Sequence, residues 1–327
     1  MQQMRHILRV EQFERAWILE ELLPIVGQLE GGWPADALRG VEIFHLFQQP
    51  SFLTRLAFSR AVRRLGGNHE QADFEDAFTA ESRRQTIEDE IRILNGLAYD
   101  GVVVRAAAAG GAERAAAVSR VPVINGGEPS HRATLGHAQH PTQALADLVT
   151  IFNARGTIDD LHVAIVPGDG ASVVVVQSLA MLLGHVCSGL RLTLVARPAL
   201  SALYQELSSY LASRGVACDR VADIRRVAAD ADVLYFAQAN NLHLGVAERY
   251  RPAGEEPGVF VLTEEVLEAV SAECAILHPL PRNIGAGQGV EEELPERFSG
   301  DRRVRIFEQA RTKHVVAGAL LYMLMGR

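Results

Sequence analysis

Short apolar runs alternate along most of the chain with segments whose apolar residues recur at helical spacing. The apolar runs predict strands, at 40–47, 100–106, 121–125, 161–167, 191–197, 232–238 and 274–280. The periodic segments predict helices, at 54–66, 83–96, 111–119, 172–185, 200–214 and 263–272. Regular alternation of strand and helix is typical of parallel sheets with helices on both faces. We therefore expect an α/β fold, and the two series of strands indicate two domains joined by a helix that begins near Pro141.

Composition narrows the class of protein. The chain has 327 residues, 48% of them hydrophobic, and a formal charge of −8, which argues against a nucleic-acid-binding surface. No run of apolar residues is long enough to predict a membrane span, and the amphipathic start lacks the apolar core of a signal peptide. The three cysteines are widely spaced, which is typical of reduced thiols, so we expect a cytoplasmic protein.

Polar residues that could form a site gather where the predicted strands end. In open α/β sheets, ligands bind beyond the carboxyl ends of the strands. The polar residues and segments at these ends are Ser51, Thr54, Arg105, the segment up to His140, "GDGAS" (168–172), "AQANN" (237–241) and "HPLPR" (278–282). The sequence thus predicts one site assembled from several strand ends.

Two of these segments have a clear local chemistry. In "HPTQALADL" (140–148), Pro141 suits the first turn of a helix, and His140 lies just before it. "HPLPR" carries two prolines, which have no N–H, so the segment favours exposed carbonyl oxygens. Taken alone, the first segment is more typical of a simple helix start than of a functional site, and the second is more typical of a rigid turn.

The order and spacing of four motifs are more specific. "PS..TRLAF", "VVVR", "QHPTQALAD" and "LHPLPR" together resemble the aspartate carbamoyltransferase branch of the aspartate/ornithine carbamoyltransferase family. The resemblance implies two doubly wound parallel-sheet domains. These are a carbamoyl-phosphate domain over 1–145 with the C-terminal helix 306–327, and an amino-acid domain over 146–305. It also implies small-molecule substrates, a homotrimer with or without a partner chain, and no metal or organic cofactor.

The resemblance also implies roles for individual residues. Arg105, His140 and Thr54 match the positions that polarise the carbonyl group of the transferred carbamoyl. Gln143 and the backbone carbonyls of Pro279 and Leu280 match the acceptors for its NH₂ group. Such a reaction needs donors for the developing oxyanion and a cationic cradle for phosphate.

The chain departs from the family at the anion-binding positions. The family's phosphate turn reads Ser-Thr-Arg-Thr-Arg, whereas this chain has Ser51-Phe52-Leu53-Thr54-Arg55. The arginines that the family uses for the aspartate carboxylates align with about Val173 and with Gln238. Three further arginines are candidates for substitute cations: Arg83 and Arg84 for the lysine of the loop that reaches an adjacent subunit, and Arg132 for the missing phosphate guanidinium.

Three functions stay open on the sequence alone. The chain is a transferase of a carbamoyl or related amide carbon with an altered donor and acceptor, or a non-catalytic homologue that serves as a structural or regulatory subunit. The third is an ordinary aspartate carbamoyltransferase with compensating arginines. The survival of Arg105, His140 and Gln143 favours the first.

Overall fold

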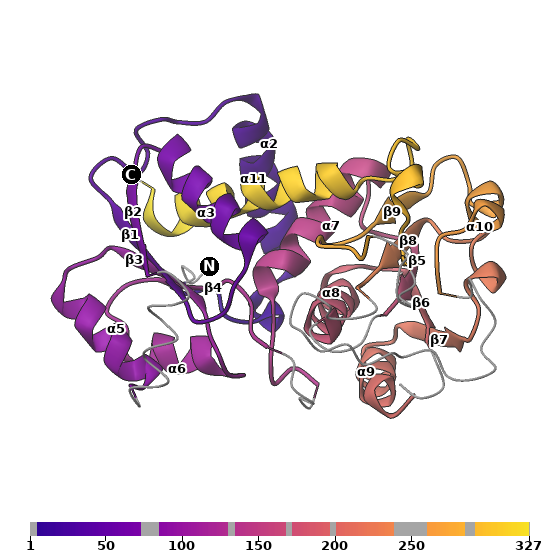
Figure 1. Ribbon diagram of the computed structural model, residues 1–327, viewed down its shortest axis with the longest axis horizontal. Coiled ribbons are helices and arrows are strands. Elements are labelled where there is room, and N and C mark those ends of the chain that lie inside the picture. Colours follow the sequence, from indigo (N-terminus) through magenta and orange to yellow (C-terminus); the bar gives the residue numbers. More distant parts are fainter. Residues whose placement is uncertain are drawn as a thin grey trace. The chain divides into compact units, whose positions relative to one another are not determined.

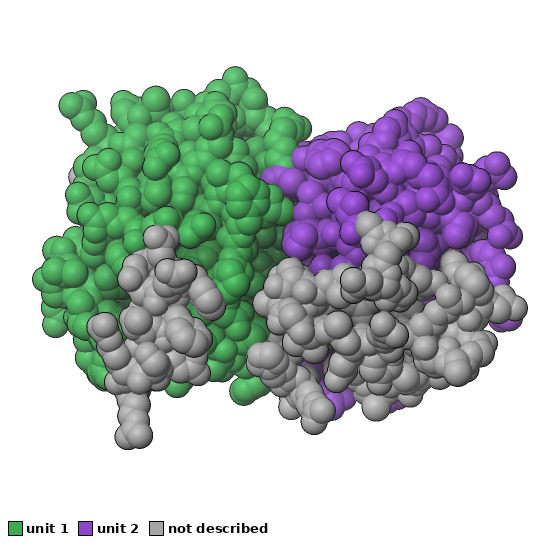
Figure 2. Space-filling model, viewed as in Figure 1, with its two compact units in different colours: residues 1–129, 136–146, 311–327 green, residues 130–135, 147–310 purple. Residues whose placement is uncertain are grey.

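The computed structural model describes residues 5–72, 85–129, 135–167, 172–196, 201–238, 260–284 and 292–326. The chain forms two compact units, coloured separately in Figure 2. Unit 1 comprises residues 1–129, 136–146 and 311–327, and unit 2 comprises residues 130–135 and 147–310. Each unit contains one parallel sheet, which confirms the predicted α/β class.

The sheet of unit 1 has four parallel strands in the order β2-β1-β3-β4 (Figure 1). They are β2 (Asn68–Ala72), β1 (Glu42–Phe47), β3 (Gly101–Arg105) and β4 (Val123–Asn125). Strands β1 and β3 pair in a register that sets Phe47 opposite Arg105. Because parallel strands end at the same edge, Arg105 lies at the carboxyl edge of the sheet, close to the loop that follows β1.

The helical elements of unit 1 include the 3₁₀ turn η1 (Val10–Gln12) and a segment that runs through α1 (Arg15–Trp17), the π-helical turn η2 (Ile18–Leu22) and α2 (Leu23–Gly31). They also include α3 (Phe52–Arg64), α5 (Ile87–Gly96) and α6 (Gly111–Val118). Apolar residues of α5 and α6 pack on β3 in one hydrophobic cluster, which contains Ile91, Leu94, Ala115, Val102 and Val104. This packing fixes β3 in the sheet, and Arg105 is the last residue of that strand.

The sheet of unit 2 has five parallel strands in the order β7-β6-β5-β8-β9. They are β7 (Ala217–Val221), β6 (Arg191–Val195), β5 (His162–Val166), β8 (Val233–Phe236) and β9 (Ala275–Leu277). The other elements are α8 (Ser172–Val186), α9 (Ser201–Ser213), η4 (Ile224–Arg226), α10 (Glu264–Ala269) and η6 (Glu296–Phe298). Helices α7 (Pro141–Arg155) and α11 (Ile306–Met325) have residues in both units.

The predicted elements differ from the structure mainly at the sheet edges. Strands β2 and β7 were not predicted, because their sequences, "NHEQA" and "ACDRV", are polar and lie at the ends of the strand order. Helix α3 begins at Phe52, two residues before the predicted start, so Phe52 and Leu53 belong to its first turn. Among the described residues, no helix is long and apolar enough to cross a membrane.

Candidate active site

Helix α3 begins with two apolar side chains. Ser51 is its N-cap residue, with an extended backbone and no hydrogen bond from its side chain to the helix. Phe52 is 74% exposed, and Leu53 is half-buried. The first backbone amides of a helix suit an anion, but residues 52 and 53 add no side-chain donor to them.

Thr54 and Arg105 both lie next to Gly126. The Thr54 side chain is fully buried, and its hydroxyl has no hydrogen-bond partner among the described residues. Its methyl group lies near Gly126, to whose carbonyl oxygen Arg105 Nη1 donates a hydrogen bond of 3.0 Å. Burial lowers the pKa of Arg105 to about 10, so its guanidinium remains charged at neutral pH. Within the described part of the chain, Arg105 forms no ion pair and its Nε has no partner. Buried polar and charged groups of this kind fit a polar ligand.

Arg105 and His140 converge on Gly127. Gly127 has a φ of +112°, a region that L-residues rarely adopt. A Cβ atom added to Gly127 would lie 2.3 Å from Arg105 Nη1 and 2.7 Å from His140 Nε2. The two nitrogen atoms therefore lie close to a single point, and only glycine allows this approach.

His140 is a buried and neutral imidazole. Its Nδ1 lies 3.3 Å from Thr142 Oγ1, and this hydroxyl lies 3.3 Å from the carbonyl oxygen of Asn125. Because a carbonyl only accepts, both contacts are hydrogen bonds if Nδ1–H donates to Thr142, which leaves Nε2 as an acceptor. Burial lowers the pKa of His140 well below its usual value, and the charges of Lys313 and then Arg105 lower it further. His140 is therefore unprotonated near neutral pH, with the lone pair on its Nε2.

Lys313 enters the same cluster from α11. It is the single lysine of the chain, it is only 6% exposed, and its Nζ donates a hydrogen bond of 2.7 Å to Oε1 of Gln143. The sequence analysis did not predict this residue. The available signal was a set of polar residues at helical spacing in the first half of α11, namely Gln309, Thr312 and Lys313, all of which are buried.

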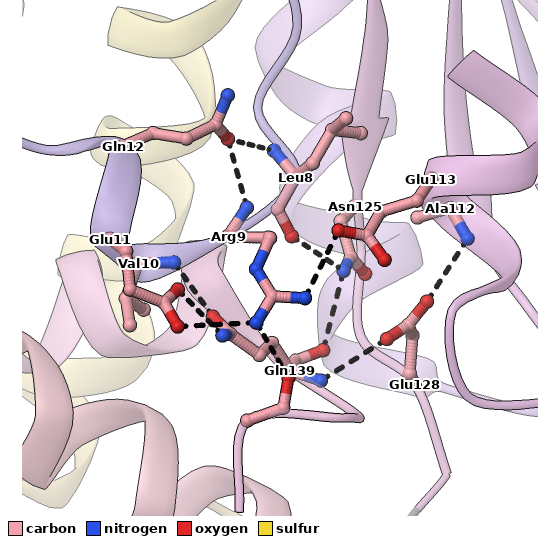
Figure 3. A network of polar contacts seen from close by, with 11 residues as sticks. Leu8, Arg9, Val10, Glu11, Gln12, Ala112, Glu113, Asn125, Glu128 and Gln139 are labelled. Atoms are coloured by element: carbon pink, nitrogen blue, oxygen red, sulfur yellow. Dashed lines mark hydrogen bonds and ion pairs between the residues drawn. The ribbon is translucent and has the colours of Figure 1, made fainter. Parts of the chain in front are cut away.

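A network of hydrogen bonds fixes the backbone on both sides of the cluster (Figure 3). The carboxylate of Glu128 accepts from the amides of Ala112 at 3.0 Å and Gln139 at 3.2 Å. The side chain of Gln139 accepts from the Val10 amide at 2.7 Å and donates to Glu11 at 2.7 Å. Burial raises the pKa of Glu128. The network ties the segment between β4 and α7 to the N-terminal segment and to α6.

The remaining arginines lie elsewhere or cannot be placed. Arg55 follows Thr54 in α3 and is half-buried, and its charge contributes to the lowered pKa of His45, after burial and His69. Arg83 and Arg132, the two arginines expected to contribute from loops, lie outside the described residues, as does Arg84.

In unit 2, the two positions at which the sequence resemblance leads us to expect carboxylate-binding arginines carry neutral residues. Val173 is buried in α8. Gln238 is buried after β8, and its Nε2 donates to Asn283 Oδ1 at 3.1 Å. The Asn283 side chain donates in turn to Glu293 Oε2 at 3.0 Å, and Glu293 Oε1 lies 2.9 Å from His278 Nε2. Gln238 is thus part of a buried network that holds the turn after β9.

This turn presents carbonyl oxygens, as its two prolines predict. Pro279 and Leu280 are half-buried, and the peptide bond between Leu280 and Pro281 is cis. No described residue donates a hydrogen bond to the carbonyl oxygens of Pro279 or Leu280. Both oxygens can therefore accept a hydrogen bond from a ligand.

Comparisons with known proteins cover both units. The carbamoyl-P binding domain of aspartate/ornithine carbamoyltransferases matches residues 5–153, and their Asp/Orn binding domain matches residues 159–324. Aspartate carbamoyltransferase 3 of Pisum sativum, a chloroplastic protein, is 31% identical over 99% of this chain and 78% of its own length. The aspartate carbamoyltransferase catalytic subunit of Methanocella arvoryzae is 32% identical over 98% of this chain and 97% of its own length.

A solved structure gives the same result for the fold. Aspartate transcarbamoylase from Trypanosoma cruzi, in complex with aspartate and phosphate, aligns with a TM-score of 0.80 and 27% identity. The alignment covers 98% of this chain and 95% of the other.

Proposed function

The chain belongs to the aspartate/ornithine carbamoyltransferase family, and from this premise we propose that it transfers a carbamoyl or related amide carbon to an amine other than aspartate. Its function is aspartate carbamoyltransferase-like in class. The observation that carries the proposal is the convergence of Arg105 and His140 on Gly127. Both side chains are buried there. The chain keeps the residues that would bind the carbonyl group of the donor, but it lacks the arginines that the family is expected to use for phosphate and for the carboxylates of aspartate.

The chemistry follows from the groups at this cluster. An amine attacks the carbonyl carbon of the donor, the carbonyl oxygen becomes an oxyanion, and the leaving group departs with the electron pair of its bond to carbon. The Arg105 guanidinium and the Thr54 hydroxyl are suited to donate to that oxyanion. The neutral His140, with its lone pair on Nε2, is suited to accept the proton that the attacking amine must lose.

The neutral positions in unit 2 support an altered acceptor. A carboxylate of aspartate would need a charged donor in place of Val173 and Gln238. Val173 offers none, and Gln238 already donates to Asn283. An amine with fewer carboxylates is therefore the better substrate. The altered first turn of α3 likewise supports a donor that is held differently from carbamoyl phosphate in the family's turn.

An exposed apolar pair favours one second candidate, a non-catalytic subunit. Phe52 is 74% exposed and Leu56, one helical turn later, is 49% exposed. Such a pair is as suited to contact another protein as to line a substrate site. Under either candidate we propose a cytoplasmic homotrimer, as the family resemblance implies, and light scattering gives the mass that tests the trimer.

The test is an activity screen in which each carbamoyl donor is combined with each amine, and the carbamoylated product is detected by mass spectrometry. Carbamoyl phosphate and neutral N-carbamoyl compounds serve as donors, and aspartate, ornithine and other amino acids serve as acceptors. We expect at least one pair to turn over faster than aspartate does, and we expect Arg105→Met or His140→Ala to lower kcat/KM by about 100-fold or more.

Arg114→Met is the matched control, because Arg114 is an exposed arginine of the same unit, 3.7 Å from Glu88. It should leave the rate unchanged. Turnover that survives both Arg105→Met and His140→Ala would contradict the proposed site. Absence of turnover with every pair, together with a catalytic partner that co-purifies, would favour the non-catalytic candidate.

A further inference from the structure

Thr142 connects the ring of His140 to the end of β4. It is the second residue of α7, and only 2% of its surface is exposed. Its Oγ1 lies 3.3 Å from His140 Nδ1 and 3.3 Å from the carbonyl oxygen of Asn125. The hydroxyl has one proton and a carbonyl oxygen only accepts, so the O–H points to Asn125 when both contacts are hydrogen bonds. Oγ1 then accepts the proton of Nδ1.

Asn125 holds this carbonyl oxygen in a fixed place. It is the last residue of β4, and its backbone amide donates to the carbonyl oxygen of Ile7 at 2.7 Å. Its buried side chain donates to the carbonyl oxygen of Leu8 at 3.0 Å (Figure 3). The same side chain accepts from the amide of Gly127 at 2.8 Å. The acceptor for the Thr142 hydroxyl is therefore fixed by the sheet and by the side chain of its own residue.

The carbonyl oxygen of His140 itself is a second acceptor near the ring. A hydrogen bond to this oxygen works against the other causes that lower the pKa of His140. The oxygen already accepts from the backbone amides of Gln143 and Ala144, each at 3.1 Å. A carbonyl oxygen has two lone pairs, so it is a poorer acceptor for a third donor than the Thr142 hydroxyl is. Both acceptors face Nδ1, the ring nitrogen nearer the main chain.

We propose that Thr142, held by Asn125, is a positioning residue that keeps the ring proton of His140 on Nδ1 and so makes Nε2 a proton acceptor in the site. The hydrogen bond at one ring nitrogen decides which nitrogen carries the proton. The inference rests on the proposed function and specifies the role of His140 in it. The family resemblance implies that His140 polarises a carbonyl group, which would need a proton on Nε2. In this chain, that task falls to Arg105 and Thr54.

The reaction then has a defined path for the proton. The nitrogen of the amine forms a bond to the carbonyl carbon, and the bond from that carbon to the leaving group breaks with its electron pair. The proton that the amine loses goes to Nε2, while Nδ1–H stays on Thr142. The charges of Lys313 and Arg105 disfavour the resulting imidazolium. The proton therefore passes on to the leaving group, which carries the electron pair, and the ring returns to its first tautomer.

The experiment locates the ring proton by nuclear magnetic resonance of the ring nitrogens at neutral pH, without substrate. The His140→Ala variant identifies the signals of this ring among the eleven histidines. In wild type we expect a protonated Nδ1 and an unprotonated Nε2. Thr142→Val keeps the shape of the side chain and removes the hydroxyl, so part of the proton population should move to Nε2. With the best pair from the activity screen, kcat should fall by about 10- to 100-fold while KM stays close to that of wild type.

Two matched variants separate the hydroxyl from general effects of the substitution. Thr142→Ser keeps the hydroxyl, so it should keep the tautomer and the kcat of wild type. Thr312→Val makes the same change at another fully buried threonine of unit 1, whose hydroxyl has no hydrogen-bond partner among the described residues. It should leave the signals of the His140 ring unchanged.

A wild-type ring with its proton on Nε2 would overturn the inference and leave the proposed function standing, with His140 as a donor. Identical ring signals in wild type and Thr142→Val would overturn it too. A proton that moves without any change in kcat would also overturn it, because the tautomer would then not matter for catalysis. A proton that moves in Thr142→Val but not in Thr142→Ser, in a protein that transfers nothing, would support the positioning role and reject the proposed function.

Discussion

Arg105 reaches so close to the backbone of Gly127 that a Cβ atom on this glycine would lie 2.3 Å from Nη1 of the guanidinium. The same atom would lie 2.7 Å from His140 Nε2. The segment between β4 and α7 therefore brings its bare backbone against the two side chains that the proposed reaction needs. The space between them is set by the absence of a side chain.

Gly127→Ala is expected to disrupt this arrangement. The new methyl group cannot coexist with Arg105 and His140 in their places, and the φ of +112° is strained for alanine. We expect a loss of about 2 kcal/mol or more in the free energy of unfolding and a fall in kcat/KM for carbamoyl transfer. Urea unfolding and steady-state kinetics measure the two effects.

Gly40→Ala is the matched control for Gly127→Ala. Gly40 also has a positive φ, +77°, but no atom lies within 4 Å of its added Cβ. It should show only the backbone cost of about 1 kcal/mol and keep the kcat/KM of wild type. Similar costs and an unchanged kcat/KM in both variants would show that the contact with Arg105 is unimportant.

The pH dependence of activity should reflect the lowered pKa of His140. Burial, Lys313 and Arg105 all favour the neutral imidazole, so protonation of His140 should reduce kcat/KM only well below pH 6.5, its usual pKa. Loss of the Lys313 charge removes a repulsion from the imidazolium form. In Lys313→Gln the pKa of His140 should therefore rise, and the acid limb of the pH–rate profile should move to higher pH.

Nuclear magnetic resonance titration of the His140 ring checks the same point without substrate. The exposed Arg311→Met variant should leave the His140 titration where it is in wild type. A titration that is identical in wild type and Lys313→Gln would mean that the ammonium does not act on the imidazole.

The packing of α11 gives a test of stability. A Cβ atom on Gly318 would lie 2.4 Å from the Trp33 ring, which is stacked on His314 at 4.7 Å and covered by Arg64 at 4.8 Å. Gly318→Ala must displace this ring, and we expect a cost of about 1–3 kcal/mol despite the better helix propensity of alanine. Thermal unfolding followed by tryptophan fluorescence measures it.

Gly27→Ala in α2 provides the comparison for Gly318→Ala. Nothing lies within 4 Å of its added Cβ, so the better helix propensity should raise stability by up to about 1 kcal/mol. If both substitutions stabilise the protein, the Trp33 contact does not restrict α11.

In unit 2, Glu293 should be important for the turn that contains Pro279 and Leu280. Its carboxylate accepts from the backbone and side-chain amides of Asn283 and lies next to His278. Glu293→Met would leave these buried donors without an acceptor, at a cost of about 2 kcal/mol or more in the free energy of unfolding. Denaturant titration measures the cost.

Glu268→Met is the control, since Glu268 is exposed on α10 and should change stability by no more than about 0.5 kcal/mol. A Glu293→Met variant as stable as this control would show that the network around Asn283 contributes little.

The sequence predicts the interior of both sheets well and their edges poorly. All residues of β5 are buried, and its sequence is a short, mostly apolar run. Such runs are easy to distinguish from the helical segments between them. The edge strand β7 has no fully buried residue, and its polar sequence carries no strand signal. Hydrophobic periodicity reports burial, so an element that buries little is missed.

The same limit applies to the site. The proximity of Arg105 and His140 could be predicted, because one lies at a strand end and the other in a recognisable motif, and the two side chains do lie close together at Gly127. Lys313 could not, because it approaches Gln143 only through tertiary packing across 170 residues. The sequence also does not reveal why position 127 is a glycine. The reason is that the side chains of Arg105 and His140 occupy the space that a Cβ atom would need.

The chain has a single lysine, which is buried, and this affects how its primary amines react with labelling reagents. Reagents that acylate primary amines find Lys313 shielded, so they should modify the terminal α-amino group far faster. Coupling to a sensor surface or a dye through amines would then give a single, defined attachment.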